Sequence, residues 1–282
     1  MELSPDIILF IQLVVSFFAG GTLIALLTFA AEKAGSRASG IILAIPSTAA
    51  LGFFFMGWVV SPDEVATIVP GTLIPLGFCI LFPLAYIYSA AVFARITGSK
   101  WLQIFLSFLT ASSIWLLLAI PLVIYRVNDP LISIPVYLLM VWVAHELMNR
   151  GLTDKPPSAV YTVRQKILRA FFVGLFIMFV VFLGKTLDPL WGGAMAMFPV
   201  AFSSSLMVMH AQYEPHYLYP AARRIPVGSL SIFVYNITVM LVFPVAGFIL
   251  GTLIAYITSL ATTLIILKLS GSPAQNSKHE KK

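Results

Sequence analysis

The sequence predicts an all-α polytopic membrane protein with about nine transmembrane helices, arranged as two inverted four-helix repeats joined by a linking helix. Composition, the distribution of basic residues and an internal repeat each support this fold class. Apolar residues make up 60% of the 282 positions and charged residues only 10%, and the mean hydropathy is +0.97. Because a soluble domain keeps about a quarter of its residues charged, this composition indicates that lipid surrounds most of the chain.

Nine apolar stretches are long enough to cross a bilayer, which takes about 20 helical residues. Proline and glycine within them do not exclude a membrane helix, because neighbouring helices can satisfy the backbone groups that these residues free. The eighth and ninth stretches are separated only by the segment 243–247. In chain order, the predicted spans are 7–30, 40–60, 69–94, 101–125, 131–147, 167–183, 191–212, 226–246 and 248–269.

These spans predict a single transmembrane domain over residues 1–269. Its parts are a first repeat (7–125), a linking helix (131–147) and a second repeat (167–269). The polar residues 270–282 contain no apolar anchor, so we expect a disordered cytoplasmic tail.

The basic residues predict the orientation. Lys and Arg collect in cytoplasmic loops of membrane proteins, and nine spans would place 15 of the 17 basic residues on one side. Only Arg126 and Lys185 fall on the other side. The sequence therefore predicts a protein of the plasma (inner) membrane with its amino terminus outside and its carboxyl terminus in the cytoplasm. Membrane lipid, rather than nucleic acid, is the partner that the formal charge of +6 suggests in this setting.

An internal repeat appears when the chain is shifted by 153 residues. Two glycines and two prolines coincide in this alignment, and such residues fix backbone geometry. After a two-residue deletion, the segment that starts at Ile74 matches the segment that starts at Ile225. The identical pairs within 18–62 are Phe18/Phe171, Gly21/Gly174, Ile24/Ile177, Phe29/Phe182, Gly40/Gly193, Pro46/Pro199, Met56/Met209 and Pro62/Pro215.

The predicted span count makes this duplication an inverted one. Four spans return the chain to its starting side, and the linking span then delivers the second repeat in the opposite orientation. Inverted repeats are characteristic of secondary transporters, although they also occur in channels and a duplication can simply build a stable bundle.

The segment from Gly40 to Ser47, the Ser61-Pro62 loop and the Pro75-x-Gly77 motif resemble small four-span membrane proteins of the GlpM-like type. Each half of the chain would match one such unit. Two inverted halves are also similar to the architecture of the drug/metabolite transporter superfamily. These resemblances imply a transporter-like fold and name no substrate.

The candidate binding site lies at the prolines of the second and seventh spans, which share a Gly-x5-Pro motif. Each proline removes one helical hydrogen bond and frees the carbonyl four residues earlier, and hydroxyl side chains follow both prolines. The alternative is that the prolines only kink the helices and the hydroxyls bond to their own backbone. An amide near the middle of the eighth span is either a site contact or an interhelical hydrogen bond. The predicted substrate contacts are Ile42, Pro46, Ser47, Thr48, Met195, Pro199, Ser203, Ser204 and Asn236.

Charged residues are absent from the central part of every predicted span, which favours a neutral, zwitterionic or amphiphilic substrate over a strong ion. We expect no cofactor and no catalytic site, because no carboxylate pair or phosphate-binding loop is present. A group near the cytoplasmic face, His145 beside Glu146 and then His210, Glu214 and His216, would be the one possible metal or proton site. The alternative is that these residues are solvated helix ends.

The sequence thus favours a secondary transporter that works by alternating access. A non-transporting accessory or assembly protein is the alternative, and a membrane-embedded enzyme is the least favoured class. A pocket at the repeat interface near the middle of the membrane would favour transport, whereas a solid, close-packed interface between the second and seventh spans would argue against transport and favour the accessory protein.

Overall fold

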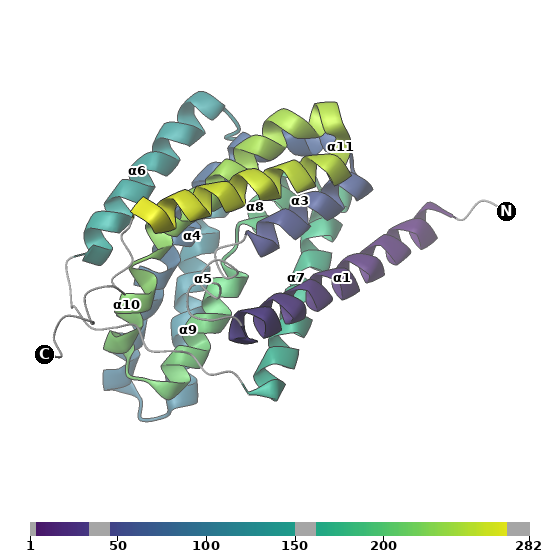
Figure 1. The fold of residues 1–282 in the computed structure, drawn as a ribbon. Coiled ribbons are helices and arrows are strands. Elements are labelled where there is room, and N and C mark those ends of the chain that lie inside the picture. The colour runs from purple at the N-terminus through teal and green to yellow at the C-terminus, as the bar shows by residue number, and fades with distance from the viewer. Residues whose placement is uncertain (1–3, 34–45, 150–161, 270–282) are drawn as a thin grey trace, which may run out of the picture.

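A computed structural model describes residues 4–33, 46–149 and 162–269, and all regular elements within these ranges are helical (Figure 1). Six helices in the described ranges are long and apolar enough to cross a membrane. The coarse prediction of an all-helical membrane protein is therefore confirmed. Ile42 and the predicted tail 270–282 lie outside the described residues. These six helices are α1 (Pro5–Lys33), α4 (Pro62–Ile96), α5 (Lys100–Ile124), α6 (Pro130–Asn149), α7 (Val163–Thr186) and α11 (Ile225–Leu269).

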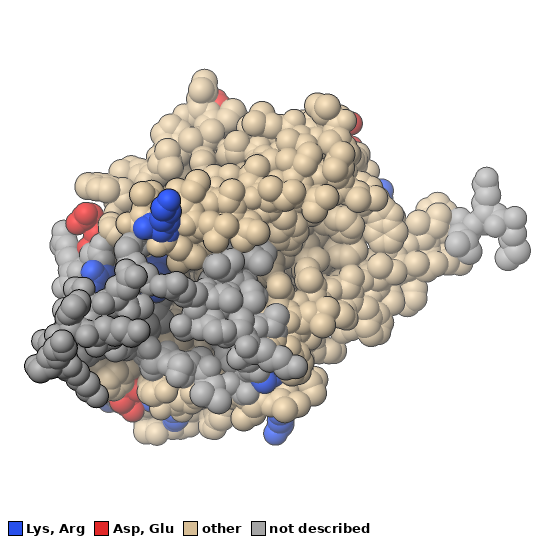
Figure 2. Space-filling view, viewed as in Figure 1, with Lys and Arg blue, Asp and Glu red and all other residues tan. Residues whose placement is uncertain are grey.

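The surface has the character expected of a lipid-facing bundle. Figure 2 shows a broad uncharged face over α11, with charged side chains toward its margins. Large apolar side chains on this helix are exposed, among them Leu241, Val245 and Ile249. In water such a continuous apolar surface would drive association, whereas in a bilayer it contacts acyl chains.

Helix α4 is the most deeply buried of the long helices and packs against α5, α6 and α11. It contains three internal prolines, and the amide of Asn128 bonds to its backbone near the first of them. Asn128 Oδ1 accepts from the Gly71 N–H at 2.6 Å, and Asn128 Nδ2 donates to the Thr67 carbonyl at 2.7 Å. A regular helix would pair these two backbone groups with each other, so the Asn128 amide substitutes for one helical hydrogen bond.

The predicted span 191–212 is two short helices, not one. Helix α8 (Pro189–Ala196) ends before Met197, and α9 (Val200–Gln212) begins after Pro199. The physical reason is that Pro199 adopts φ −78° and ψ 52°, outside the helical region, so it starts a new helix instead of kinking a continuous one. A 3₁₀ turn, η1 (Pro215–Leu218), and the short α10 (Tyr219–Ala222) follow.

Helix α11 reverses direction at Gly247, inside the break predicted between the last two spans. Gly247 has φ 70° and ψ 176°, a conformation that is essentially restricted to glycine. Contacts on either side pair residues in antiparallel order: a Cβ atom on Gly251 would lie 2.6 Å from the Phe243 ring, and the earlier Tyr235 stacks edge-on against the later Tyr256. The segments 225–246 and 248–269 therefore form a helical hairpin.

Helices α1 and α7 cross in direct backbone contact. A Cβ atom on Gly21 would lie 2.9 Å from the Ala170 carbonyl oxygen, and one on Gly174 would lie 2.5 Å from the Phe17 carbonyl oxygen. Farther along α1, the Phe29 ring meets Lys166. As the residue number rises in α1 it falls in α7, so the two helices run in opposite directions. Small residues permit this close approach.

Candidate functional site

The two prolines predicted to interrupt the second and seventh spans have almost the same conformation. Pro46 has φ −73° and ψ 64°, close to the values at Pro199, and each precedes a helix of 13 residues. The first of these helices, α3 (Ser47–Val59), receives its first backbone bond from the Ala50 N–H to the Pro46 carbonyl at 2.9 Å. The equivalent bond in α9 runs from the Ser203 N–H to the Pro199 carbonyl at 2.8 Å.

The carbonyl that the sequence analysis expected to be freed at Met195 already has a partner. It accepts from the Phe198 N–H at 2.8 Å, because the chain forms a tight turn between α8 and α9. Met195 is half-buried, Pro199 is buried, and the Ser203 hydroxyl bonds to the Val200 carbonyl at 3.0 Å. The alternative for these polar residues was that their hydroxyls bond to their own backbone, and Ser203 shows such a bond. Ser204, on the same helix, is half-buried.

An aromatic cluster holds the turn between α8 and α9 in place. Phe198 packs edge-on against Trp115 of α5 at 5.1 Å and against Phe82 of α4 at 6.0 Å between ring centroids. The Trp115 indole donates to the Pro75 carbonyl of α4 at 3.2 Å. Side chains from α4 and α5 therefore hold the break between α8 and α9, so its geometry depends on how these helices pack together.

Asn236 lies directly against this break. Its side chain is fully buried, and its Nδ2 approaches the Met197 sulfur at 3.5 Å. Among the described residues no hydrogen-bond partner reaches its Oδ1. A buried amide oxygen without a partner carries a desolvation cost of about 1–3 kcal/mol, so this oxygen is suited to accept from a hydroxyl or amide group that enters the site. The structure therefore places Asn236 against Met197, in the turn between the predicted residues Met195 and Pro199.

Among the predicted residues of the second span, Pro46 lies against the second half of α11. Pro46 is buried, whereas Ser47 and Thr48 are half-buried. Pro46 lines a cavity of about 210 Å³ against the second half of α11. That cavity contains no residue of α8 or α9; its other lining residues are Tyr256, Ile257, Ser259, Leu260 and Thr263.

Helices α3 and α8 meet in close contact in this conformation. A Cβ atom on Gly52 would lie 2.9 Å from the Cβ of Ala196, so not even a methyl group fits between the two helices there. The facing arrangement predicted for the second and seventh spans is therefore present as a packed contact instead of an open site.

Three of the polar residues considered as a metal or proton site take separate roles. His210 is fully buried on α9, and its Nδ1 lies 3.1 Å from the Tyr86 hydroxyl. Glu214 instead pairs with Lys100 at 3.2 Å, at an exposed position. His145 lies on α6. No group of three or more His, Cys, Asp or Glu side chains in the described ranges could hold a metal ion.

Comparison of the chain with protein-family models, curated proteins and solved structures finds no match. Functional inference therefore depends on geometry alone. The sequence analysis did not find Met197, Phe198, Trp115 or Asn128, since apolar and loop residues carry no local signal of their partners. The proline expected to free a carbonyl in the seventh span, Pro199, and the amide of Asn236 were the sequence features that pointed toward this region.

Proposed function

We propose that the protein is a secondary transporter built from two inverted repeats, which carries a neutral, zwitterionic or amphiphilic small molecule by alternating access. The crossing of α1 and α7 carries this proposal. In the alignment shifted by 153 residues, Gly21 pairs with Gly174 and Phe17 pairs with Ala170. Exchanging each residue for its aligned partner therefore turns the Gly21–Ala170 contact into the Gly174–Phe17 contact, and both are present. A pair of contacts that exchange in this way indicates a twofold axis between the helices. Because the helices are antiparallel, that axis would lie in the membrane plane.

Element bounds support the same alignment. After the shift by 153 residues, the last residue of α1 coincides with that of α7, and α3 coincides with α9 over its full length. Pro62, at the start of α4, coincides with Pro215 at the start of η1. In this assignment α8 and α9 together form one interrupted span, and the α11 hairpin supplies the last two of nine spans.

Two ion pairs support the predicted grouping of the loops on the two sides of the membrane. Lys100 and Glu214 join loops that were both predicted to be cytoplasmic, and Arg126 and Asp188 join loops that were both predicted to be outside. If the predicted number of spans between two paired loops were wrong by one, the two members of each pair would lie on opposite sides of the membrane.

The interrupted span around Met197 is the proposed substrate site, with Asn236 as its main polar contact. Transporters commonly bind substrate where a membrane helix is broken near the interface of two repeats. The buried residues among the described ranges include no Asp, Glu, Lys or Arg. A strong ion would have no counter-charge there, so an uncharged or internally compensated substrate is favoured.

An accessory or assembly role is the second candidate, and the close contact of Gly52 with Ala196 favours it. A permanently packed interface would leave no path through the protein. In an alternating-access cycle the same contact would be the closed gate of one conformation, and would open in the other.

Cysteine accessibility distinguishes these two functions. In a Cys79→Ala background, single Ser47→Cys and Ser204→Cys variants are labelled with a membrane-impermeant maleimide from either side of oriented vesicles. A transporter gives labelling at each position that depends on the side and on conformation. Labelling of neither position from either side would instead establish a static bundle.

A further inference from the structure

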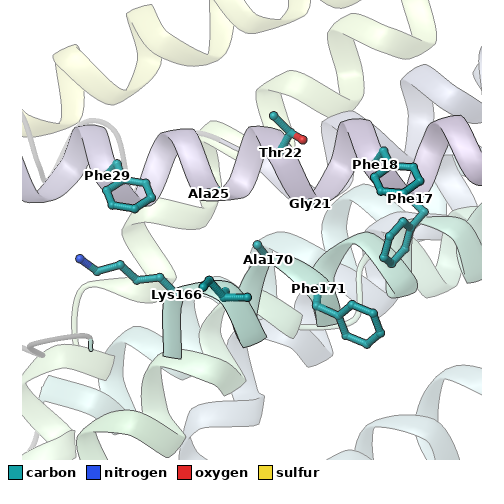
Figure 3. Close-up of a pocket in the computed structure, with 10 residues that line it drawn as sticks. Phe17, Phe18, Gly21, Thr22, Ala25, Phe29, Lys166, Ala170 and Phe171 are labelled. Atoms are coloured by element: carbon teal, nitrogen blue, oxygen red, sulfur yellow. The ribbon is translucent and has the colours of Figure 1, made fainter. Parts of the chain in front are cut away.

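A lateral groove of about 280 Å³ lies between α1 and the first half of α7. Figure 3 shows its lining, with Phe18, Gly21, Ala25 and Phe29 from α1 facing Ala170 and Phe171 from α7. Apart from one lysine and one threonine, the lining residues are apolar or glycine.

The groove belongs to a surface that faces lipid. Both of its helices are candidate membrane spans, and the side chains at its rim are strongly exposed, with Phe18 at 63% and Phe171 at 50%. An apolar crevice between lipid-facing helices is filled most favourably by an acyl chain, since water cannot satisfy its hydrogen bonds there.

One end of the groove carries a positive charge. Lys166 lies near Phe29, with its Nζ 5.0 Å from the centroid of the ring, which holds the ammonium group at the mouth of the groove (Figure 3). Arg164 and Arg169 lie within the first two turns of the same helix. These residues are on the side that holds 15 of the 17 basic residues in the predicted topology, where anionic lipids are concentrated in a cytoplasmic leaflet.

The charge is not shared by the other repeat. In the alignment shifted by 153 residues, Leu13 of α1 takes the position of Lys166. The repeat-related end of the crossing therefore has an apolar residue where this end has an ammonium group. At this position, only the end at Phe29 carries a cation.

We propose that the α1–α7 groove is a binding site for an anionic phospholipid of the cytoplasmic leaflet. One acyl chain would lie along Phe18, Ala25 and Phe171, and the headgroup phosphate would contact Lys166. This site is separate from the proposed substrate site at Met197 and does not depend on transport.

The test measures lipid affinity on the full-length protein in a neutral detergent, by native mass spectrometry with titrated phospholipid. Phosphatidylglycerol and phosphatidylcholine with the same acyl chains are compared. We expect tighter binding of phosphatidylglycerol. Lys166→Gln should weaken that lipid about fivefold, because one basic residue near the headgroups is worth about 1 kcal/mol. Phosphatidylcholine binding should be almost unchanged by this substitution.

Two further variants make the test specific to the groove. Ala25→Leu narrows the groove and should weaken both lipids alike. Lys268→Gln removes a basic residue at the end of α11, which lies outside the groove, and should leave both affinities unchanged. Equal affinity of the wild type for the two lipids would overturn the proposal. So would an equal loss in the Lys166 and Lys268 variants, because binding would then follow general surface charge.

Discussion

Removal of the Asn128 amide tests whether this side chain replaces a helical hydrogen bond in α4. In an Asn128→Ala variant, the Gly71 N–H loses its acceptor at 2.6 Å, and the Thr67 carbonyl loses its donor at 2.7 Å. Gly71 is buried, whereas Thr67 is exposed. An unsatisfied buried donor costs about 1–3 kcal/mol, and the exposed carbonyl can bond to water. We therefore expect the free energy of unfolding to fall by about 1–3 kcal/mol.

The assay is reversible unfolding of purified protein in mixed micelles, followed by tryptophan fluorescence as the denaturing detergent is increased. Asn128→Asp is the matched control, because a carboxylate still accepts from Gly71 but sets an acceptor oxygen against the exposed Thr67 carbonyl, which can turn to water. It should cost less than the alanine variant. A cost below about 0.5 kcal/mol for Asn128→Ala would refute the reasoning, because α4 would then have closed the bond between Thr67 and Gly71 by itself.

Three further substitutions test the crossing, the hairpin and the contact between α6 and α11. Gly174→Ala would place a methyl group 2.5 Å from a backbone oxygen of α1, and should lower the free energy of unfolding by about 1–3 kcal/mol. Gly228→Ala, a helical control with no atom within 4 Å of the new methyl group, should be neutral or stabilising in the same assay. Gly247→Ala should cost about 1–3 kcal/mol, because its positive φ is strained for any residue with a Cβ, and should also raise protease sensitivity at the hairpin. Tyr137→Phe removes the 2.9 Å bond to the Ser229 hydroxyl and should lower the melting temperature by an amount that corresponds to about 1 kcal/mol.

The features that the sequence predicted well depend on local physics. Spans are set by runs of apolar residues, and the reversal at Gly247 follows from a residue type that alone tolerates the required φ. The distinction between a kink and a break at Pro199 is not local. It depends on Phe198, whose ring is held by Trp115 and Phe82 from other helices, so the prediction of one continuous span was wrong at this point.

The site was only partly predictable for the same reason. An amide in an apolar span signals that it needs a partner, and this pointed to Asn236. The identity of the partner depends on how α11 packs against the α8–α9 break, and no sequence pattern encodes that contact. Similarly, nothing about Asn128 in a short loop indicates that its amide reaches the backbone of α4.

The differences between the two halves suggest how a symmetric scaffold could acquire a directional function. The residues that repeat are backbone-controlling ones, such as Gly21 with Gly174 and Pro46 with Pro199, and they build the crossing and the paired helix starts. The polar groups do not repeat: Ala85 takes the position of Asn236 in the first half. In the proposed transporter, a substrate contact would therefore exist on one side of the proposed twofold axis only. The proposed alternating-access cycle would require the two halves to exchange shape, but not chemistry, so the single Asn236 amide would hold the substrate in both conformations.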